Sequence, residues 1–370
     1  MRSPGNSSAA VYRAGIAVAA VGAAFVLGAI MMVALGANPF IGYKALFTGA
    51  FGNREHLADT AVKAMPLLLV GTGICISFRA RVINIGGEGQ IVAGALLATV
   101  TALALPGPPP VVLVPLVLLA GIVGGAAWGA IPGALKAYLG VNEILSTIML
   151  NIVAVQVMNY LLRGPLIDPH EVGARIPQTR RLSPNADLPI LLHGTRLHLG
   201  VVVALVAAVA AWVFLWRTTT GYRLRAAGAN KDAARYAGIA VKRMTTLALT
   251  ASGAMCGLAG AVLVFGSESH RFVTDGSATG FTGSAGFNGI VAALFGGLHP
   301  LLTIPASLLF GGLLVGANAM QRSVQIPVSL VIAVNGLVVV FVAASVTLRE
   351  RVTARFESIR RARPRPEAAE

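Results

Sequence analysis

The stretch that decides the fold is a polar segment that reads Arg217-Thr-Thr-Thr-Gly221-Tyr-Arg223-Leu-Arg225-Ala-Ala-Gly228-Ala-Asn230-Lys231-Asp232-Ala-Ala-Arg235-Tyr-Ala-Gly238-Ile-Ala-Val-Lys242-Arg243. Seven basic residues stand in it against one acidic residue. Long apolar runs flank it on both sides, at residues 201–216 and 247–265. Basic connections between membrane helices accumulate on the cytoplasmic side. The pattern therefore predicts two membrane helices joined by a cytoplasmic segment, residues 217–245.

Inside this segment the sequence has the signals of a short helix. Asn230 is a favourable N-cap, Asp232 complements the first turn, and Gly238 can end the helix. A helix of about two turns is marginal in water on its own. Its small residues, Ala233 and Ala234, suit insertion into a groove of another protein. We interpret it as an element that docks a cytoplasmic partner; the alternative is an ordinary positively charged loop.

Composition indicates a membrane protein throughout. The chain has 370 residues, of which 56% are hydrophobic and 12% charged, and its 43 glycines suit close helix packing in lipid. The net charge of +15 does not indicate nucleic-acid binding, because the basic residues are distributed over loop ends. We predict an all-α, polytopic helical membrane protein with a cytoplasmic N-terminal segment (1–13), a transmembrane domain (14–347) and a basic cytoplasmic tail (348–370) that contacts anionic lipid.

Ten apolar runs predict about ten transmembrane helices, with both termini in the cytoplasm. They lie at about residues 14–35, 64–78, 82–105, 111–135, 144–162, 198–216, 246–265, 284–298, 301–319 and 327–346. Spans 2 and 8 are short, so eight or nine crossings remain an alternative. Residues 163–197, with five prolines, form the longest connection, which this topology places outside.

Two glycine-rich segments occupy corresponding places in the two halves of the chain, residues 84–94 and 286–297. In the predicted topology the halves are inverted, and spans 3 and 8 are broken or short. Interrupted spans at matching positions of inverted halves are typical of a transport pathway. The glycines let backbone approach a ligand, and the alternative is that they only pack helices tightly.

Polar residues in or beside the spans supply candidate pathway contacts. Glu88 either lines the pathway or pairs with Arg79 or Arg81, because an unpaired carboxylate is costly in a membrane. The amides in apolar spans bond neighbouring helices or line the pathway. The candidate pathway residues are Asn84, Glu88, Gln90, Asn151, Phe287, Asn288 and Asn335.

The sequence lacks the motifs of several chemistries. There is no P-loop motif, so we expect no ATPase site and no nucleotide cofactor in this chain. The six histidines show no metal-ligand spacing, and the two cysteines, Cys75 and Cys256, lie in apolar runs as packing residues. We therefore expect neither a metal site nor an enzyme.

Four motifs resemble the permease subunits of bacterial ABC importers. They are Asn84-Ile-Gly-Gly-Glu88-Gly89-Gln90, Val141-Asn142-Glu143-Ile-Leu-Ser-Thr147-Ile-Met149-Leu-Asn151, the run of residues 221–234 and Phe287-Asn288-Gly289-Ile-Val-Ala. The likeness covers about residues 60–347 and is nearest to the branched-chain amino acid, simple sugar and nucleoside permeases. The first two motifs look most like the purine nucleoside branch.

The resemblance implies the partners and the coupling site. It implies two cytoplasmic ATP-binding subunits that hydrolyse ATP, a second, paralogous permease, and an extracytoplasmic substrate-binding protein or lipoprotein, all at the cytoplasmic (inner) membrane. The coupling residues it implies are Gly221, Arg225, Gly228, Asn230, Asp232, Ala233, Ala234 and Gly238. The alternatives are a permease for simple sugars or branched-chain amino acids, and an ATP-independent carrier or channel.

Overall fold

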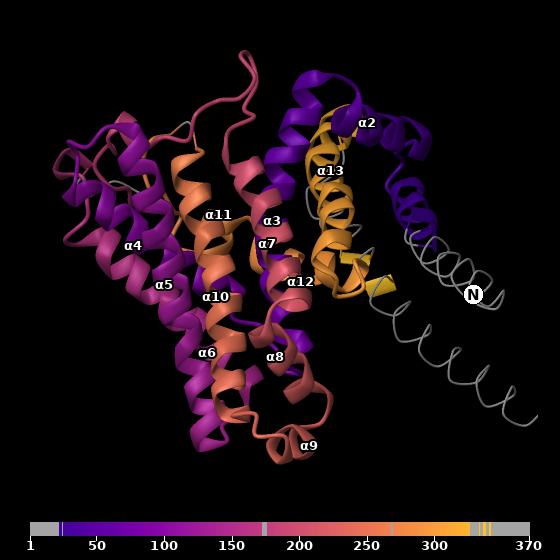
Figure 1. Cartoon of the computed structure of the whole chain (residues 1–370). Coiled ribbons are helices and arrows are strands. Elements are labelled where there is room, and N and C mark those ends of the chain that lie inside the picture. Colours follow the sequence, from indigo (N-terminus) through magenta and orange to yellow (C-terminus); the bar gives the residue numbers. More distant parts are fainter. Residues whose placement is uncertain are drawn as a thin grey trace, which may run out of the picture. The chain divides into compact units, whose positions relative to one another are not determined.

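The computed structural model describes residues 22–23, 25–171, 176–267 and 269–325, with residues 333, 336, 337, 340 and 341. It divides into two compact units, Ala50–Val315, and Met1–Gly49 with Gly316–Glu370. In the described part the repeating secondary structure is helical, and strand-like pairing is limited to isolated bridges (Figure 1). The predicted all-α fold is therefore confirmed.

The larger unit holds most of the helices. They are α3 (Arg54–Arg79), α4 (Gly87–Ala104), α5 (Pro110–Leu139), α6 (Glu143–Arg163), α7 (Gly200–Arg217), α8 (Thr219–Ala229), α9 (Lys231–Tyr236), α10 (Val241–Phe265), α11 (Ala278–Thr282), α12 (Ala285–Phe295) and the first part of α13 (Pro300–Val324). Two 3₁₀ turns, η1 (Pro169–Glu171) and η2 (Pro184–Ala186), lie between α6 and α7. The smaller unit includes the apolar helix Phe25–Ala34, most of α2 (Pro39–Phe51) and the end of α13.

Seven helices of the described chain are long and apolar enough to cross a membrane: α3, α4, α5, α6, α7, α10 and α13. They coincide with predicted spans 2 to 7 and span 9. Predicted span 8 corresponds to α12, which has only 11 residues. Span 1 is described only in part, and most of span 10 and the tail, residues 348–370, lie outside the described residues.

The second span is longer than its sequence predicts. An apolar run at residues 64–78 predicts a short helix, whereas α3 begins at Arg54 and has 26 residues. The side chain of Asn53 caps it by accepting a hydrogen bond from the backbone N of His56 at 2.7 Å. The predicted start is wrong because the first turns of α3 are polar. A prediction from apolar runs leaves out polar turns, even where they continue the same helix beyond the hydrocarbon layer.

Helix α10 forms the centre of the larger unit, where it packs on α5, α4 and α3. Glycines make this packing close: a Cβ atom at Gly257 would lie 2.1 Å from the carbonyl oxygen of Gly121. One at Gly253 would lie 2.3 Å from the carbonyl oxygen of Gly125. Small residues on facing helices are the usual means of close approach in lipid. This packing brings α10 against the start of α4, where the candidate site lies.

The described residues of the connection between α6 and α7, 164–171 and 176–199, fold into a cap with residues 266–267 and 269–277. Leu182 donates its backbone N–H to His270 at 2.8 Å, and Arg271 forms an ion pair with Asp168 at 2.9 Å. Phe272 is fully buried beneath these contacts. The cap lies at one end of the larger unit, and α8 and α9 lie at the opposite end (Figure 1).

The smaller unit is held by aromatic and glycine contacts of its own. The hydroxyl of Tyr43 donates to the backbone carbonyl of Phe25, and the two rings lie 5.2 Å apart, edge to face. A Cβ atom at Gly49 would lie 2.3 Å from the Cβ atom of Ala319, so α2 and the end of α13 are in close contact.

Candidate functional site

Asn84 and Gln90 form a buried amide pair at the start of α4. The Nδ2 of Asn84 donates to the Oε1 of Gln90 at 2.9 Å and to the Oγ of Ser252 at 2.8 Å. Its Oδ1 accepts from the backbone N of Gly86 at 2.9 Å and from the Nε2 of Gln90 at 3.2 Å. Both amides are almost fully buried. Asn84 lies in the non-helical segment that precedes α4, and its bond to Ser252 attaches this segment to α10.

Glu88 lies in the first turn of α4 and is 2% exposed. Its Oε2 accepts a hydrogen bond from the hydroxyl of Thr282, and its Oε1 accepts from the backbone N of Phe287 at 3.2 Å. Phe287 is in the first turn of α12, where backbone N–H groups lack helical partners and a negative charge is stabilised. Glu88 thus joins the start of α4 to the start of α12.

The alternative in which Glu88 pairs with Arg79 or Arg81 is wrong. Arg79 instead donates from Nε and Nη2 to the backbone carbonyl of Leu298, at 3.2 and 3.1 Å. The described chain contains no ion pair of Glu88 with either arginine. The sequence gives no local signal for the partners that Glu88 does have, because they lie far along the chain.

The two glycine-rich segments meet directly. A Cβ atom at Gly286 would lie 2.5 Å from the backbone N of Glu88, and one at Gly87 would lie 3.2 Å from the Cα of Gly286. These glycines therefore allow α4 and α12 to start in contact. The arrangement joins two segments that are almost 200 residues apart in the sequence.

Asn151 on α6 also bonds the segment at the start of α4. Its Oδ1 accepts from the backbone N of Gly89 at 2.9 Å, and its Nδ2 donates to the carbonyl of Ile85 at 3.0 Å. Phe287 is 46% exposed, and Asn288 beside it is half-buried. Asn335 lies outside the described residues.

The capping signals of the polar segment are present in the structure. The Oδ1 of Asn230 accepts from the backbone N of Asp232 at 3.0 Å and of Ala233 at 3.1 Å, which starts α9. Gly238 follows α9 with φ of +76°, a conformation that favours glycine. Ala234 is buried, whereas Ala233 is exposed. Asn230 thus ends α8 and begins α9.

Helix α8 is an element that the sequence reading missed. Thr218 caps it by accepting from the backbone N of Gly221 at 3.0 Å. Gly221 and Gly228 pack on backbone: Cβ atoms there would lie 2.0 Å from the carbonyl oxygen of Phe214 and 2.2 Å from that of Arg79. Arg225 lies between them and places its guanidinium carbon 5.7 Å from the ring centre of Trp216. Helix α8 is therefore fitted tightly to the ends of α7 and α3.

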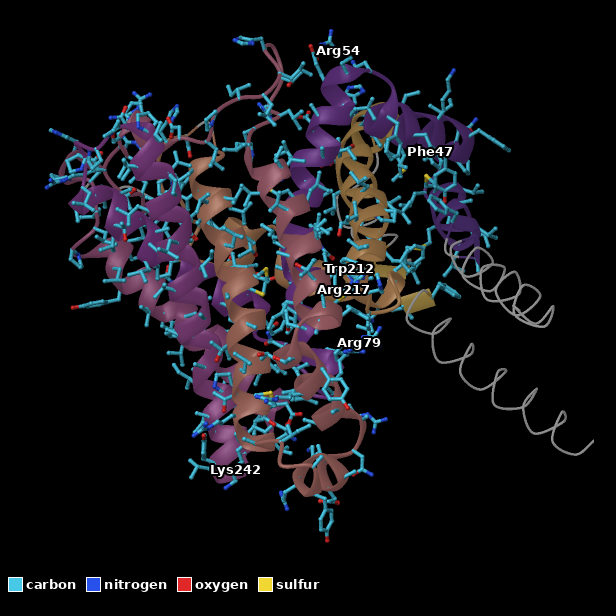
Figure 2. The ribbon with its side chains drawn as sticks, in the orientation of Figure 1. Phe47, Arg54, Arg79, Trp212, Arg217 and Lys242 are labelled. Atoms are coloured by element: carbon cyan, nitrogen blue, oxygen red, sulfur yellow. The ribbon has the colours of Figure 1, made fainter. Side chains whose placement is uncertain are left out.

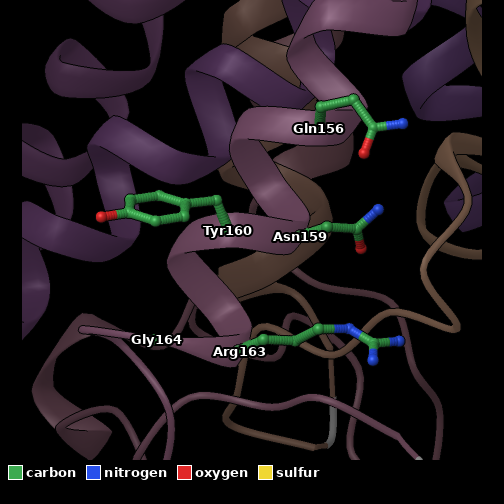
Figure 3. A pocket seen from close by; sticks show the side chains of 5 residues that line it. All are labelled: Gln156, Asn159, Tyr160, Arg163 and Gly164. Atoms are coloured by element: carbon green, nitrogen blue, oxygen red, sulfur yellow. The ribbon is translucent and has the colours of Figure 1, made fainter.

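A polar recess on α6 is a second feature that the sequence reading did not identify. Gln156, Asn159, Tyr160, Arg163 and Gly164 line a volume of about 410 Å³. The side chains of Gln156, Asn159 and Arg163 point to one side of the helix, and Tyr160 points to the other (Figure 3). Asn159 donates to the backbone carbonyl of Gly276 at 2.9 Å. The spacing of Gln156, Asn159 and Arg163, three and four residues apart, is the sequence signal that could have indicated a polar face on α6.

The chemistry of these residues is that of binding and packing. Within the described ranges, no three His, Cys, Asp or Glu side chains gather in a way that could hold a metal ion. Glu143, at the start of α6, is paired with Lys136. The ring of Phe287, which is exposed, and the amide of Asn288, which is half-buried, are the groups of this region that a ligand can reach.

Comparison with known proteins finds relatives that match most of the chain. The chain is 36% identical to the guanosine ABC transporter permease protein NupP of Bacillus subtilis over 87% of this chain and 90% of that protein. It is 34% identical to the nucleoside ABC transporter permease protein NupB of Lactococcus lactis over 86% of this chain and 87% of that protein. It is 33% identical to the glucose ABC transporter permease protein TsgB13 of Haloferax volcanii over 90% of this chain and 87% of that protein.

A family model matches most of the chain. It is the model of the branched-chain amino acid transport system permease component, and it matches residues 56–343. This range contains the amide pair, Glu88, Asn151 and both helices of the polar segment. With seven helices able to cross a membrane, the chain is a multi-pass membrane protein, and it belongs to the family of ABC-type permease components of the branched-chain amino acid transport systems.

Proposed function

We propose that this chain is the permease subunit of an ATP-driven importer for nucleosides. The observation that carries the proposal is the similarity to the guanosine and nucleoside permease proteins over more than four fifths of each chain. The proposed ligand class fits the site, because a nucleoside presents a flat base and uncharged hydroxyl groups. An exposed ring and amide groups are matched to those features.

The proposed pathway runs past the meeting point of α4 and α12. Glu88, Asn84 and Gln90 hold the shape of this point, and Phe287 and Asn288 offer the surface that faces a ligand. The exposed fraction of Phe287, 46%, supports its role as a stacking face. The proposal includes ten crossings in two inverted halves, with Asn335 contributing from the second half.

The proposed coupling element is residues 217–245. Cytoplasmic ATPase subunits engage α9, and closure of those subunits displaces α8 and the helices on which it packs. The close fit of Gly221 and Gly228 to backbone supports this role, since a tightly seated helix transmits displacement. In this proposal the chain binds no cofactor, and ATP is bound and hydrolysed by the two partner subunits.

The proposed assembly adds a second permease and an extracytoplasmic binding protein or lipoprotein. The cap lies at the opposite end of the larger unit from α9 (Figure 1). In the proposed orientation in the cytoplasmic membrane, with both termini in the cytoplasm, the cap faces outward and is the surface on which a binding protein docks. Five prolines stiffen its chain.

A second candidate substrate is a simple sugar. The specific observation is the 33% identity to the glucose permease protein of Haloferax volcanii, close to the values for the nucleoside relatives. A sugar shares the hydroxyl groups of a nucleoside but lacks its base. A stacking face at Phe287 therefore favours the nucleoside.

Competition for uptake distinguishes the candidates. Cells that express the chain together with the proposed ATPase subunits and second permease are supplied with labelled guanosine, and unlabelled adenosine, ribose, glucose or leucine is added in excess. The proposal expects adenosine to compete and the others to leave guanosine uptake unchanged. Competition by glucose or ribose alone contradicts a nucleoside importer and supports the sugar permease.

A further inference from the structure

Three arginines line one cavity at the end of the larger unit that carries α8 and α9. The cavity has a volume of about 390 Å³. Its lining residues are Phe78, Arg79, Arg81, Arg225, Gly228, Ala229, Gly297 and Leu298. They come from the end of α3, from α8 and from the turn between α12 and α13. No Asp or Glu is among them, so the cavity is strongly positive and favours an anion.

Arg79 and Arg225 are held by neutral groups, which leave their positive charges without a negative partner. Arg79 donates to the carbonyl of Leu298, and its guanidinium carbon lies 5.2 Å from the ring centre of Trp216. Arg225 lies over the same ring at 5.7 Å, and its Nε is buried with no hydrogen-bond partner. In the part of the chain that the structure describes, Arg79, Arg81 and Arg225 form no ion pair. An anionic ligand in this cavity would supply the negative charge that no described residue supplies.

An apolar stripe on α7 leads to this cavity. Val202, Val206, Val209 and Val213 are 41%, 62%, 47% and 39% exposed. Their spacing of three and four residues puts them on one face of the helix, and Trp216 continues that face one turn further. The stripe and the arginine cavity therefore meet at Trp216.

The cavity lies where the apolar helices α3 and α7 end, at Arg79 and Arg217. Figure 2 shows Trp212 and Arg217 close in height and Arg79 below them, all between Arg54 and Lys242. Arg217 also lies over the ring of Trp212 at 5.5 Å. Tryptophan and arginine at the ends of apolar helices mark the headgroup region of a bilayer.

We propose that the cavity binds the phosphate of an anionic phospholipid, with the acyl chains lying along the valine stripe of α7. Arginines recognise phosphate oxygens through paired N–H groups, and the buried Nε of Arg225 gains an acceptor in this arrangement. A carboxylate of a partner protein would match the charge but would leave the valine stripe uncovered. The bound lipid would contact both α8 and the end of α3. This role is separate from the transport function proposed above.

The test measures lipid retention on the purified full-length chain in a neutral detergent, using native mass spectrometry. Phosphatidylglycerol is titrated in parallel with phosphatidylcholine and with inorganic phosphate. We expect phosphatidylglycerol to bind in preference to phosphatidylcholine. We expect Arg81→Gln and Arg225→Gln each to weaken retention about fivefold, from the contribution of one basic residue near an anionic surface.

Arg223→Gln is the matched control, because Arg223 lies on α8 two residues from Arg225, is exposed and does not line the cavity. It should retain phosphatidylglycerol as the native chain does. Arg225→Lys keeps the charge but not the paired N–H groups, so it should retain more phosphatidylglycerol than Arg225→Gln and less than the native chain. Thermal unfolding of each variant without added lipid checks that the fold is intact.

Three results overturn the proposal. If Arg223→Gln loses as much phosphatidylglycerol as Arg225→Gln does, lipid binding depends on the net charge of the chain and not on the cavity. Inorganic phosphate binding that is lost in Arg225→Gln while phosphatidylglycerol retention is unchanged means that the cavity takes a free anion. Unchanged lipid retention in Arg81→Gln, together with lost assembly with the ATPase subunits, assigns the cavity to an acidic partner protein. None of these results depends on which solute the complex transports.

Discussion

The Oε1 of Glu88 accepts a hydrogen bond from the backbone N of Phe287 at 3.2 Å. This bond joins the starts of α4 and α12, two helices that are far apart in the sequence. The carboxylate also accepts from the hydroxyl of Thr282 at the end of α11. A movement that separates α4 from both α11 and α12 must therefore break both hydrogen bonds to this buried carboxyl group, which makes the contact a probe of the transport cycle.

Replacing Glu88 by alanine should destabilise the protein and impair transport. The change leaves the hydroxyl of Thr282 and the N–H of Phe287 without a partner, at about 1–3 kcal/mol. We expect a lower melting temperature in detergent and reduced guanosine uptake at equal membrane level. Glu88→Gln keeps the shape of the side chain and one acceptor oxygen, so its melting temperature should lie between those of the native chain and Glu88→Ala. A melting temperature of Glu88→Ala equal to the native value would contradict the contact.

Replacing Gly286 by alanine should separate α4 from α12. The new Cβ would lie 2.5 Å from the backbone N of Glu88, which cannot move as a side chain can. Overpacking of this kind costs about 1–3 kcal/mol. Thermal unfolding measures the loss, and Gly107→Ala is the control, because a Cβ atom there meets nothing within 4 Å. Equal melting of the two variants would show that the close approach is absent.

Replacing Asn230 by alanine should uncouple transport from ATP hydrolysis. The side chain caps α9 through two backbone N–H groups, and loss of such a cap costs about 1 kcal/mol of helix stability. Membrane insertion should persist, whereas uptake and stimulation of ATPase activity in the assembled complex should fall. Asn230→Asp restores a cap and should restore both activities. Full uptake by Asn230→Ala would count against α9 as the coupling element.

Acid should destabilise the protein through His299. Burial, with a smaller contribution from the Arg79 guanidinium, lowers the pKa of His299 below its ordinary value of 6.5. The unfolded chain therefore takes up this proton at a higher pH than the folded chain does. Stability is full above pH 6.5 and declines as the pH falls below it.

The measurement is the melting temperature between about pH 7.5 and 5.5, which brackets the ordinary histidine pKa, for the native chain and for His299→Gln. The variant should lose part of the acid-induced decline, because glutamine does not titrate. His193→Gln, in the cap, is the control and should decline like the native chain. An identical decline in His299→Gln and the native chain would show that His299 does not contribute.

Local features of the fold follow from the sequence. The cap at Asn230 and the glycine at Gly238 are recognisable because a cap depends only on residues a few positions away. Predicted spans 4, 5, 7 and 9 lie within the limits of one helix each for a similar reason, since an apolar run long enough to cross lipid has few other uses. The start of α3 at Arg54 is missed because its first turns are polar.

Contacts between distant segments do not follow from the sequence. Nothing local indicates that Glu88 bonds Thr282 and Phe287, so pairing with the nearby Arg79 or Arg81 was the natural alternative. Helix α8 is missed because its stability comes from packing Gly221 and Gly228 on the ends of α7 and α3. The shared ring of Trp216 between Arg79 and Arg225 depends on the same tertiary packing.

The central claim is that a separate ATPase drives this chain through residues 217–245. The most direct test reconstitutes the chain, its paralogous permease and the ATPase subunits in vesicles, with the binding protein outside and ATP on the ATPase side. The account predicts accumulation of labelled guanosine against its gradient only when ATP and the ATPase subunits are both present. Accumulation by the permease chain alone, with no nucleotide supplied, would contradict it.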